Sequence, residues 1–491
     1  MDALPEVIRQ FNELSRVSRC SGNEEPVRTW LQAWARSRNL DTARDGAGNI
    51  RIDIPATSGR AGEASLVLQA HQDMVCEARS GSAYDFAQSG ISVERDGDWL
   101  TAWETTLGAD DGAGIALMLG LYDAGLPDHP QLEFLFTASE ESTMAGARGL
   151  EAGFLRGRLL LNLDSEQEGS LTIGCAGLRG IEVKLPVERH TRSAATGHGA
   201  AVCAKISVTG LRGGHSAVDI HRGQANANLI LARFLRFARG RLELQLTSLK
   251  SGNALNMVAR EGECTVLLPG QLLPQLVELS AAASNRLREE FADTDPSLEI
   301  SCSEISGSTR AALTTASLNR VCDLIVALPH GVIRVFDPPS SGLVRTSVNL
   351  ARAELSEREL VIELSMRAAT REDGDEAAKQ VEAVASLAGA RFGSTTWFEP
   401  WRAKDQSISR IRAVSAYRKA LRSAIREEIA HGVLECGVIA ERIPDMDMVS
   451  IGPTIAGAHS PGERVSVSSL ERVARFLHEY IRAPKDAERS K

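Results

Sequence analysis

The 491-residue sequence lacks the features that usually direct a chain into a membrane or out of the cell. It has no run of about 18 or more apolar residues, the length that a membrane-spanning helix needs. Met1–Cys20 mixes charged and apolar residues at helical spacing, without the apolar core of a secretory signal. The eight cysteines include no C-x-x-C pair, so we expect reduced thiols and no disulfide framework. These absences predict a cytoplasmic protein without a membrane partner.

An excess of positive charge is also missing. The 64 acidic and 55 basic residues give a formal net charge of −9, and aromatic residues make up only 4%. Nucleic-acid-binding proteins usually carry clustered basic charge, so we expect no nucleic-acid partner. The patterns G-x-x-x-x-G-K-[ST], H-E-x-x-H and G-x-S-x-G do not occur. Their absence counts against a P-loop nucleotide site, a zincin and an α/β-hydrolase, and leaves other small-molecule chemistry as the favoured function.

The composition is typical of a globular protein, with 43% hydrophobic and 24% charged residues. At roughly 150 residues per domain the length suggests about three domains. The first third alternates short apolar runs with a helical pattern, which predicts an α/β domain with a mostly parallel sheet flanked by helices. The predicted strands are Ser65–Ala70, Leu132–Ala138 and Leu159–Leu163, and the predicted buried helix is Gly112–Ala124.

The pattern changes at about Gly180 and changes back after residue 402. Between these points, strands alternate with helical patterns, which predicts an inserted α+β domain, and a second group of elements raises the hypothesis of an internal duplication. The predicted helices of the insertion are Ala225–Arg239, Leu272–Phe291, Ala311–Leu328 and Asp375–Gly389. The elements predicted after it are a helix at Ile408–His431, a strand at Met446–Ile451 and a helix at Ser466–Ile481. We therefore expect a discontinuous domain, residues 1–180 and 403–491, interrupted by residues 181–402.

Ionisable side chains follow directly after the predicted parallel strands. His71 and Asp73 follow the first strand, Glu140 and Glu141 the second, and Asp164 the third. In open α/β sheets the ligand crevice lies outside the carboxyl ends of the strands, so we expect these side chains to converge. Two further segments carry similar residues: Asp110 in G-A-D-D-G and His459 in G-A-H-S-P.

This residue set indicates a metal site. Imidazoles and carboxylates suit zinc, with manganese or cobalt as substitutes. Several carboxylates in one crevice would repel one another without a cation. Five ligands are too many for one tetrahedral ion but suit two ions that share a carboxylate and activate a water for hydrolysis. A further carboxylate would then act as general base.

The chain also carries eight sequence blocks in a characteristic order. They are LQAHQDMV (68–75), TLGADDGAGIA (106–116), FTASEES (136–142), LNLDSE (161–166), GLRGGHSAVDIHRGQANAN (210–228), SGNALNMVAR (251–260), HGVLECG (431–437) and DMVSIGPTIAGAHSPGERV (447–465). Together they resemble the M20 metallopeptidases, and within them the aminoacyl-histidine dipeptidases, over nearly the whole chain. The resemblance implies a catalytic domain of the dizinc aminopeptidase type with a lid or dimerisation-like insertion. It also implies hydrolysis of dipeptides that end in histidine, with broader tolerance, and allows a homodimer.

The resemblance further implies a role for each candidate residue. The implied ligands form two metal sites that share Asp110: His71 and Asp164 at one site, Glu141 and His459 at the other. Glu140 would be the general base, and Asp73 would orient the imidazole of His71. The implied substrate-binding residues lie in the insertion: His215, Asn256 and Arg367.

Simpler interpretations stand beside these roles. Glu140 and Glu141 could be an acidic first turn of a helix, and His215 could merely follow a glycine-rich turn. Ser139 stands where many relatives carry an acidic residue, and His221, His431 and Glu435 have no assigned role. The same site could serve an N-acyl amino acid deacylase or a carboxypeptidase. A catalytically inactive peptide-binding scaffold is disfavoured, since the full set of ligands and the base are present.

Overall fold

The computed structural model describes residues 3–190, 201–306, 311–337 and 343–483. The chain forms two compact units, which we describe separately. Unit 1 comprises the described residues of 1–175, 401–430 and 434–491, and unit 2 those of 176–400 and 431–433. Within the described ranges, every helix is too short or too polar to cross a membrane.

In its described part, unit 1 is built on an eight-stranded sheet with the order β1-β2-β6-β3-β7-β21-β8-β20. The strands are β1 (Asp41–Arg44), β2 (Ile50–Ile54), β3 (Leu66–His71), β6 (Leu132–Thr137), β7 (Leu159–Asn162), β8 (Ser170–Cys175), β20 (Arg426–Ala430) and β21 (Asp447–Ser450). The central strands β6, β3, β7 and β21 are parallel, which confirms the prediction made from the apolar runs of β3, β6 and β7. Their carboxyl ends therefore lie at one edge of the sheet.

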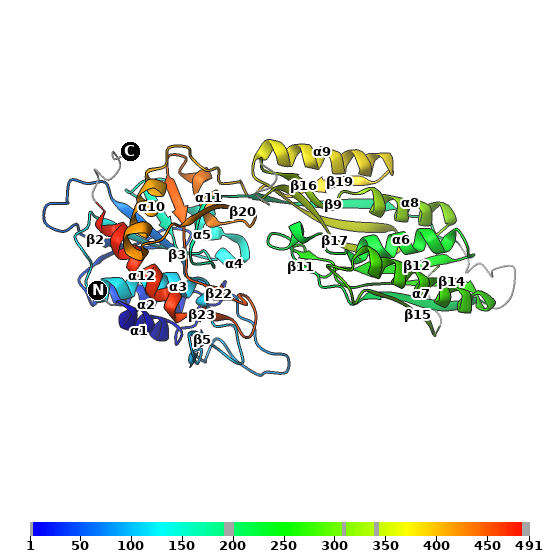
Figure 1. The fold of residues 1–491 in the computed structure, drawn as a ribbon, viewed down its shortest axis with the longest axis horizontal. Helices are drawn as coiled ribbons and strands as arrows, with labels where there is room; N and C mark the ends of the chain where they lie inside the picture. Colours follow the sequence, from blue (N-terminus) through cyan, green and yellow to red (C-terminus); the bar gives the residue numbers. More distant parts are fainter. Residues whose placement is uncertain (1–2, 191–200, 307–310, 338–342, 484–491) are drawn as a thin grey trace. The chain divides into compact units, whose positions relative to one another are not determined.

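Helices cover this sheet and fix the positions of its strands (Figure 1). Those that share the main hydrophobic core are α1 (Leu4–Leu14), α2 (Glu25–Arg36), α3 (Ala109–Asp123), α10 (Ile408–Leu421) and α12 (Val467–Arg482). Alternate strand residues such as Leu66, Leu68 and Ala70 enter the same core, because successive side chains of a strand point to opposite faces. The shorter helices α5 (Ala145–Gly149) and α11 (Glu435–Arg442) pack against each other.

A smaller four-stranded sheet in unit 1 has the order β22-β23-β5-β4. Its strands are β4 (Glu94–Asp96), β5 (Trp99–Thr101), β22 (Ile455–Ala456) and β23 (Arg464–Ser466). The segment that joins β22 to β23 carries His459, so this sheet holds the carboxyl-terminal candidate ligand next to the amino-terminal part of the chain.

Unit 2 contains, among its described residues, a nine-stranded sheet with the order β15-β10-β14-β12-β17-β18-β9-β19, and β16 pairs with β17. The strands are β9 (Gly177–Pro186), β10 (Ala201–Thr209), β12 (Gln245–Ser251), β14 (Gly262–Pro269), β15 (Glu299–Ile305), β16 (Gly331–Val335), β17 (Val344–Leu355), β18 (Glu359–Ala368) and β19 (Arg391–Ser394). The helices α6 (Ala227–Arg239), α7 (Leu273–Glu290), α8 (Thr315–Ala327) and α9 (Arg371–Leu387) share one core with the sheet (Figure 1). The predicted antiparallel α+β arrangement of the insertion is confirmed.

The two halves of this sheet have matching element orders. One half contains β10, α6, β12, β14, α7 and β15, and the other contains β9, α8, β17, β18, α9 and β19. They join where β12 pairs antiparallel with β17. Apart from β16, the ninth strand of the sheet, each half reads strand, helix, two strands, helix, strand. That this layout arose by internal duplication stays a prediction.

Two sequence-based predictions are wrong. The predicted helix Ile408–His431 ends at Leu421, and the following residues form β20, which pairs with β8 at the edge of the sheet. Tertiary pairing here overrides the helical preference of the Glu-rich segment. The prediction of reduced thiols also fails at two positions, because Cys20 and Cys76 form a disulfide. Cys20 lies beside Met74 in a parallel bridge, a proximity that no sequence spacing signals.

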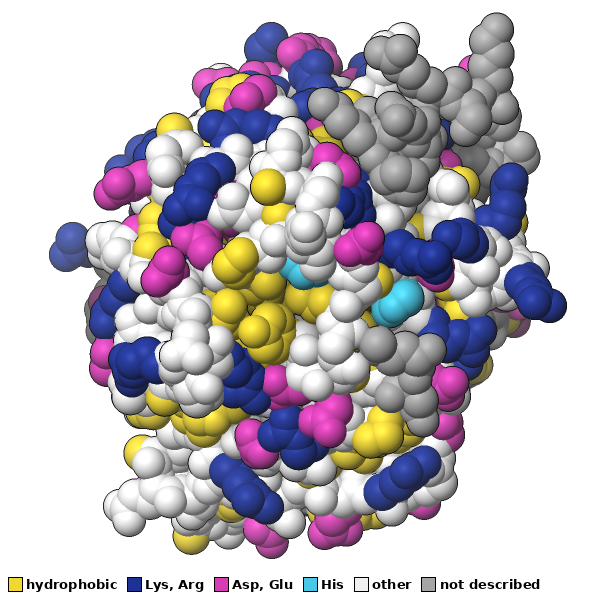
Figure 2. Space-filling view, turned by 90° about the vertical axis from the view of Figure 1, so that its left-hand side faces the viewer, with side chains coloured by type: hydrophobic (Ala, Val, Ile, Leu, Met, Phe, Trp, Pro, Cys, Tyr) yellow, Lys and Arg dark blue, Asp and Glu magenta, His cyan; other side chains and the backbone are white. Residues whose placement is uncertain are grey.

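Surface charge agrees with the composition. On the face shown in Figure 2, basic and acidic side chains alternate around a central group of hydrophobic side chains.

Candidate metal centre

The predicted convergence of strand ends in unit 1 is confirmed. β3 ends at His71, β6 is followed by the short helix α4 (Glu140–Thr143), and β7 is followed by Asp164. Because β6 and β7 flank β3 in parallel, these three chain segments leave the sheet side by side.

Asp110 lies between the two candidate histidines. Its Oδ1 is 2.9 Å from Nε2 of His71, and its Oδ2 is 3.1 Å from Nε2 of His459. Each histidine also faces a second carboxylate: Asp164 Oδ1 is 3.4 Å from His71 Nε2, and Glu141 Oε2 is 2.9 Å from His459 Nε2. The five residues that the family resemblance implies as ligands therefore lie close together, with Asp110 between the two histidines.

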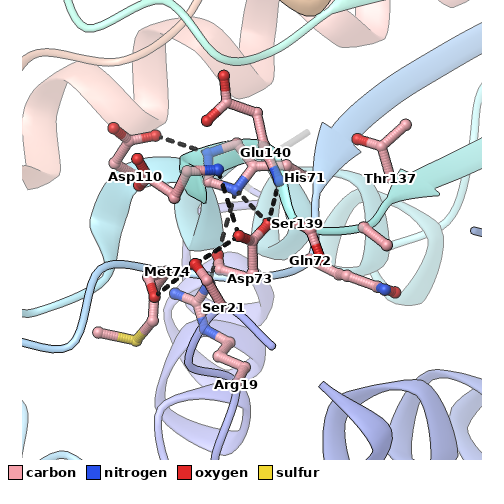
Figure 3. Close-up of polar contacts among 12 residues, drawn as sticks. Arg19, Ser21, His71, Gln72, Asp73, Met74, Asp110, Thr137, Ser139 and Glu140 are labelled. Atoms are coloured by element: carbon pink, nitrogen blue, oxygen red, sulfur yellow. Dashed lines mark hydrogen bonds and ion pairs between the residues drawn. The ribbon is translucent and has the colours of Figure 1, made fainter. Parts of the chain in front are cut away.

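Asp73 organises one side of this cluster (Figure 3). Its Oδ1 accepts the backbone N–H of Glu140 at 2.9 Å, and its Oδ2 accepts that of Glu141 at 3.3 Å. Oδ2 also accepts the hydroxyl of Ser21 at 2.7 Å, and Nδ1 of His71 lies 3.5 Å from Oδ1. One buried carboxylate thus positions both a candidate ligand and the candidate base.

The electrostatics of the cluster fit a cation. Burial and the neighbouring Asp110 raise the pKa of Asp164, and burial together with Glu141 raises the pKa of Glu140. The hydrogen bonds that His459 donates to the Asp110 and Glu141 carboxylates raise the pKa of His459 to about 11. Carboxylates outnumber the histidines, so protons or cations must balance the charge.

The donor set has the chemistry of a divalent-metal site. His71, Asp110 and Glu141 offer ligand atoms that all lie within 4.8 Å of one another. Glu141 Oε1 is buried and has no hydrogen-bond partner among the described residues. Imidazole nitrogens with carboxylate oxygens are typical zinc ligands and also suit manganese or cobalt. The residues present therefore fit the metal ions that the sequence predicted.

The predicted substrate-binding residues form a second cluster, within unit 2. His215 lies in the two-residue strand β11 (Gly214–His215), which pairs with β13 (Met257–Val258) next to Asn256. The backbone N–H of Ser216 donates to the carbonyl of Asn256 at 2.7 Å, and Arg367 Nε donates to Ser216 Oγ at 3.4 Å. His215, Asn256 and Arg367 are therefore neighbours through Ser216, which follows His215 and bonds to the other two.

His431 and Ser347 belong to this second cluster, although the sequence assigned them no role. His431 Nε2 lies 2.7 Å from Ser347 Oγ, and its backbone carbonyl accepts from Arg367 at 3.5 Å. Burial and the charge of Arg367 lower the pKa of His431 to about 3, so its imidazole is neutral. The block HGVLECG contains His431, but nothing in its spacing places the residue beside Arg367.

Two other undecided residues have structural contacts. Glu435 is buried and accepts hydrogen bonds from Gln69 at 2.7 Å and Thr137 at 2.5 Å, which tie β3 to β6. Burial raises its pKa to about 7. Ser139 donates its hydroxyl to Glu24 at 2.7 Å, so it anchors the turn before Glu140 without adding a charge.

The ends of the strands in a mostly parallel sheet thus gather histidines and carboxylates around one central aspartate, an arrangement that suits a metal-dependent hydrolase. The chain belongs to peptidase family M20/M25/M40, whose family model matches residues 67–483.

Relatives of known name cover nearly the whole chain. It is 32% identical over 472 residues to the cytosol non-specific dipeptidase of Escherichia coli (strain K12), across 96% of both chains. The crystal structure of aminoacylhistidine dipeptidase from Vibrio alginolyticus shares 32% identity with a TM-score of 0.80, covering 97% of this chain and 96% of that one. A tripeptidase from Staphylococcus aureus, at 16% identity, a TM-score of 0.56 and 99% coverage of both chains, shares the fold.

Proposed function

We propose that this protein is a cytoplasmic dipeptidase that uses two divalent metal ions, zinc above all, and accepts Xaa-His dipeptides along with other dipeptides. The observation that carries the proposal is the place of Asp110, with one carboxylate oxygen toward each of two histidines. The names of the Escherichia coli and Vibrio alginolyticus relatives support the substrate class. In this proposal unit 1 is the catalytic domain and unit 2 the lid.

His71 and Asp164 would hold one ion, Glu141 and His459 the other, and Asp110 would contact both. When bound, the ions supply a Lewis acid for the peptide carbonyl and lower the pKa of water. Glu140 takes the proton from the attacking water and returns it to the leaving amine. Asp73 holds Glu140 for this transfer through the Glu140 backbone N–H, 2.9 Å away.

Unit 2 would supply the peptide-binding groups. Arg367 carries a guanidinium that can bind the terminal carboxylate of a dipeptide in a bidentate manner. His215 would donate to the carbonyl oxygen as negative charge develops there, and Asn256 would bind the peptide backbone. Because His431 beside Arg367 is neutral, it adds no second positive charge next to the guanidinium.

A substrate panel tests this function. The purified protein, supplied with zinc, manganese or cobalt, should release histidine from alanyl-histidine and β-alanyl-histidine and also cleave other dipeptides. N-acyl amino acids and longer peptides serve as the competing substrates. Faster cleavage of N-acyl amino acids than of any dipeptide would make the protein a deacylase instead.

A further inference from the structure

The backbone segment that carries Asp110 is held by a single buried carboxylate. Glu463 is only 1% exposed and lies between β22 and β23, four residues after His459. Its carboxylate accepts four consecutive backbone N–H groups, from Leu107 at 2.8 Å, Gly108 at 2.9 Å, Ala109 at 2.7 Å and Asp110 at 3.1 Å. Converging backbone N–H groups of this kind form an anion-binding concavity, and here a side chain of the same chain fills it.

A buried cation holds the same segment at Gly108. Arg19 is 2% exposed, and its Nη2 donates to the carbonyl of Gly108. Its Nη1 donates to the carbonyl of Asp73 at 2.7 Å (Figure 3). Arg19 therefore connects the segment after His71 to the segment before Asp110, and its charge is attracted by Glu463.

The conformation of this segment leaves little room for adjustment. Gly108 has a φ of +68°, in the left-handed region that favours glycine. A Cβ atom at Gly108 would lie 2.5 Å from Arg19 Nη2 and 2.7 Å from Met74 Sδ. The turn before Asp110 is therefore shaped by close packing as well as by its hydrogen bonds.

We propose that Glu463 and Arg19 are positioning residues for the metal centre: they fix residues 107–110 so that the Asp110 carboxylate stays between His71 and His459. The inference rests on the metal role proposed for Asp110. Glu463 lies four residues after the candidate ligand His459. Arg19 donates to the carbonyl of Asp73, two residues after the candidate ligand His71. Among the described residues, the hydrogen bonds of both side chains go to backbone groups, so their effect passes through the backbone.

Another buried glutamate of unit 1 provides a matched control. Glu133 in β6 is fully buried and accepts the backbone N–H groups of Arg156 at 2.9 Å and Gly157 at 2.6 Å. Like Glu463, Glu133 holds a loop through backbone N–H groups, but this loop carries no candidate ligand. A Glu133→Gln variant thus shows what the loss of such an anchor does to folding alone.

The test compares zinc binding in the full-length wild type and in Glu463→Gln, Arg19→Lys and Glu133→Gln. Metal-free protein is titrated with zinc against a chromogenic chelator, and kcat and KM for alanyl-histidine and the urea midpoint are measured alongside. Removal of groups that orient ligands typically weakens metal affinity about 10- to 100-fold. We expect a loss in that range for Glu463→Gln with a lower kcat and little change in KM, and a smaller loss for Arg19→Lys. Glu133→Gln should move only the urea midpoint.

Wild-type zinc affinity in a folded Glu463→Gln protein would overturn the proposal, as would an equal loss of affinity in Glu133→Gln. If Glu463→Gln does not fold, the Arg19→Lys variant tests the proposal. Unchanged zinc affinity in Arg19→Lys would then contradict it. A wild type that binds two zinc ions but cleaves no dipeptide would contradict the proposed function while leaving this positioning role in place. A wild type that binds no zinc would contradict both.

Discussion

At the scale of single residues, the carboxylates of Asp110 and Asp73 each contact two partners, one with each oxygen. Asp110 directs one oxygen to each histidine, and Asp73 directs its two oxygens to consecutive backbone N–H groups at Glu140 and Glu141. A carboxylate used in this way fixes the distance between its two partners. The relative placement of the candidate ligands and the base is thereby set by a few side chains and not by loop packing alone.

The role of Glu140 can be tested by one substitution. Glu140→Gln keeps the side-chain shape but cannot take up a proton, so kcat should fall about 10²- to 10⁴-fold, as for other general bases. Metal content, measured by atomic absorption, should stay at the wild-type value. Glu151→Gln, at an exposed position nearby in the sequence, is the control. Near-normal kcat in Glu140→Gln would remove the base from the mechanism.

His330 predicts a pH dependence of stability. Burial lowers the pKa of His330 to about 4, below the value of roughly 6.5 expected in the unfolded chain. Between these pH values the unfolded state binds the extra proton, so the free energy of unfolding falls as the pH falls. The loss from this group should reach about 2 kcal/mol at pH 5. Urea unfolding at pH 7.5 and pH 5 measures it, and an equally steep dependence in His330→Asn would exclude His330 as the cause.

At the scale of elements, the sequence predicts the parts that follow from local patterns. The apolar runs of β3, β6 and β7 predict parallel strands, and the polar residues after them predict the site, because the carboxyl ends of parallel neighbours must meet. The segment after Leu421 is misjudged, because only pairing with β8 makes it a strand. Ser21, Arg19 and Glu463 are not predicted as functional, since each acts on the backbone or side chain of a partner remote in sequence.

The Cys20–Cys76 disulfide joins the segment between α1 and α2 to the segment that follows β3, across 56 positions of the chain. Closing a loop of this length stabilises a protein by about 2–4 kcal/mol, chiefly by restricting the unfolded state. Reduction with a dithiol, or the double substitution Cys20→Ser and Cys76→Ser, should lower the free energy of unfolding by that amount. Denaturant titration measures the change. No change on reduction would mean that the two thiols are not bonded in solution.

At the scale of the whole molecule, unit 1 is built from stretches of chain that lie on both sides of the insertion. The candidate ligands come from both sides of the insertion, His71 to Asp164 before it and His459 after it, and they meet in unit 1. The compact units divide after Cys175 and Pro400, within a few residues of the junctions expected from the change in sequence pattern. His431–Val433 belong to unit 2, although the residues on both sides of them belong to unit 1. The sequence pattern does not predict this, because it depends on contacts with Ser347 and Arg367.

The dependence of dipeptide hydrolysis on two metal ions at one shared site is the core of the proposed function. It is tested most directly by removing all metal with a chelator and adding zinc back in measured steps while histidine release from alanyl-histidine is followed. We expect no activity in the metal-free protein and full activity at two zinc ions per chain. Activity that survives exhaustive chelation, or that is complete at one ion per chain, would contradict the account.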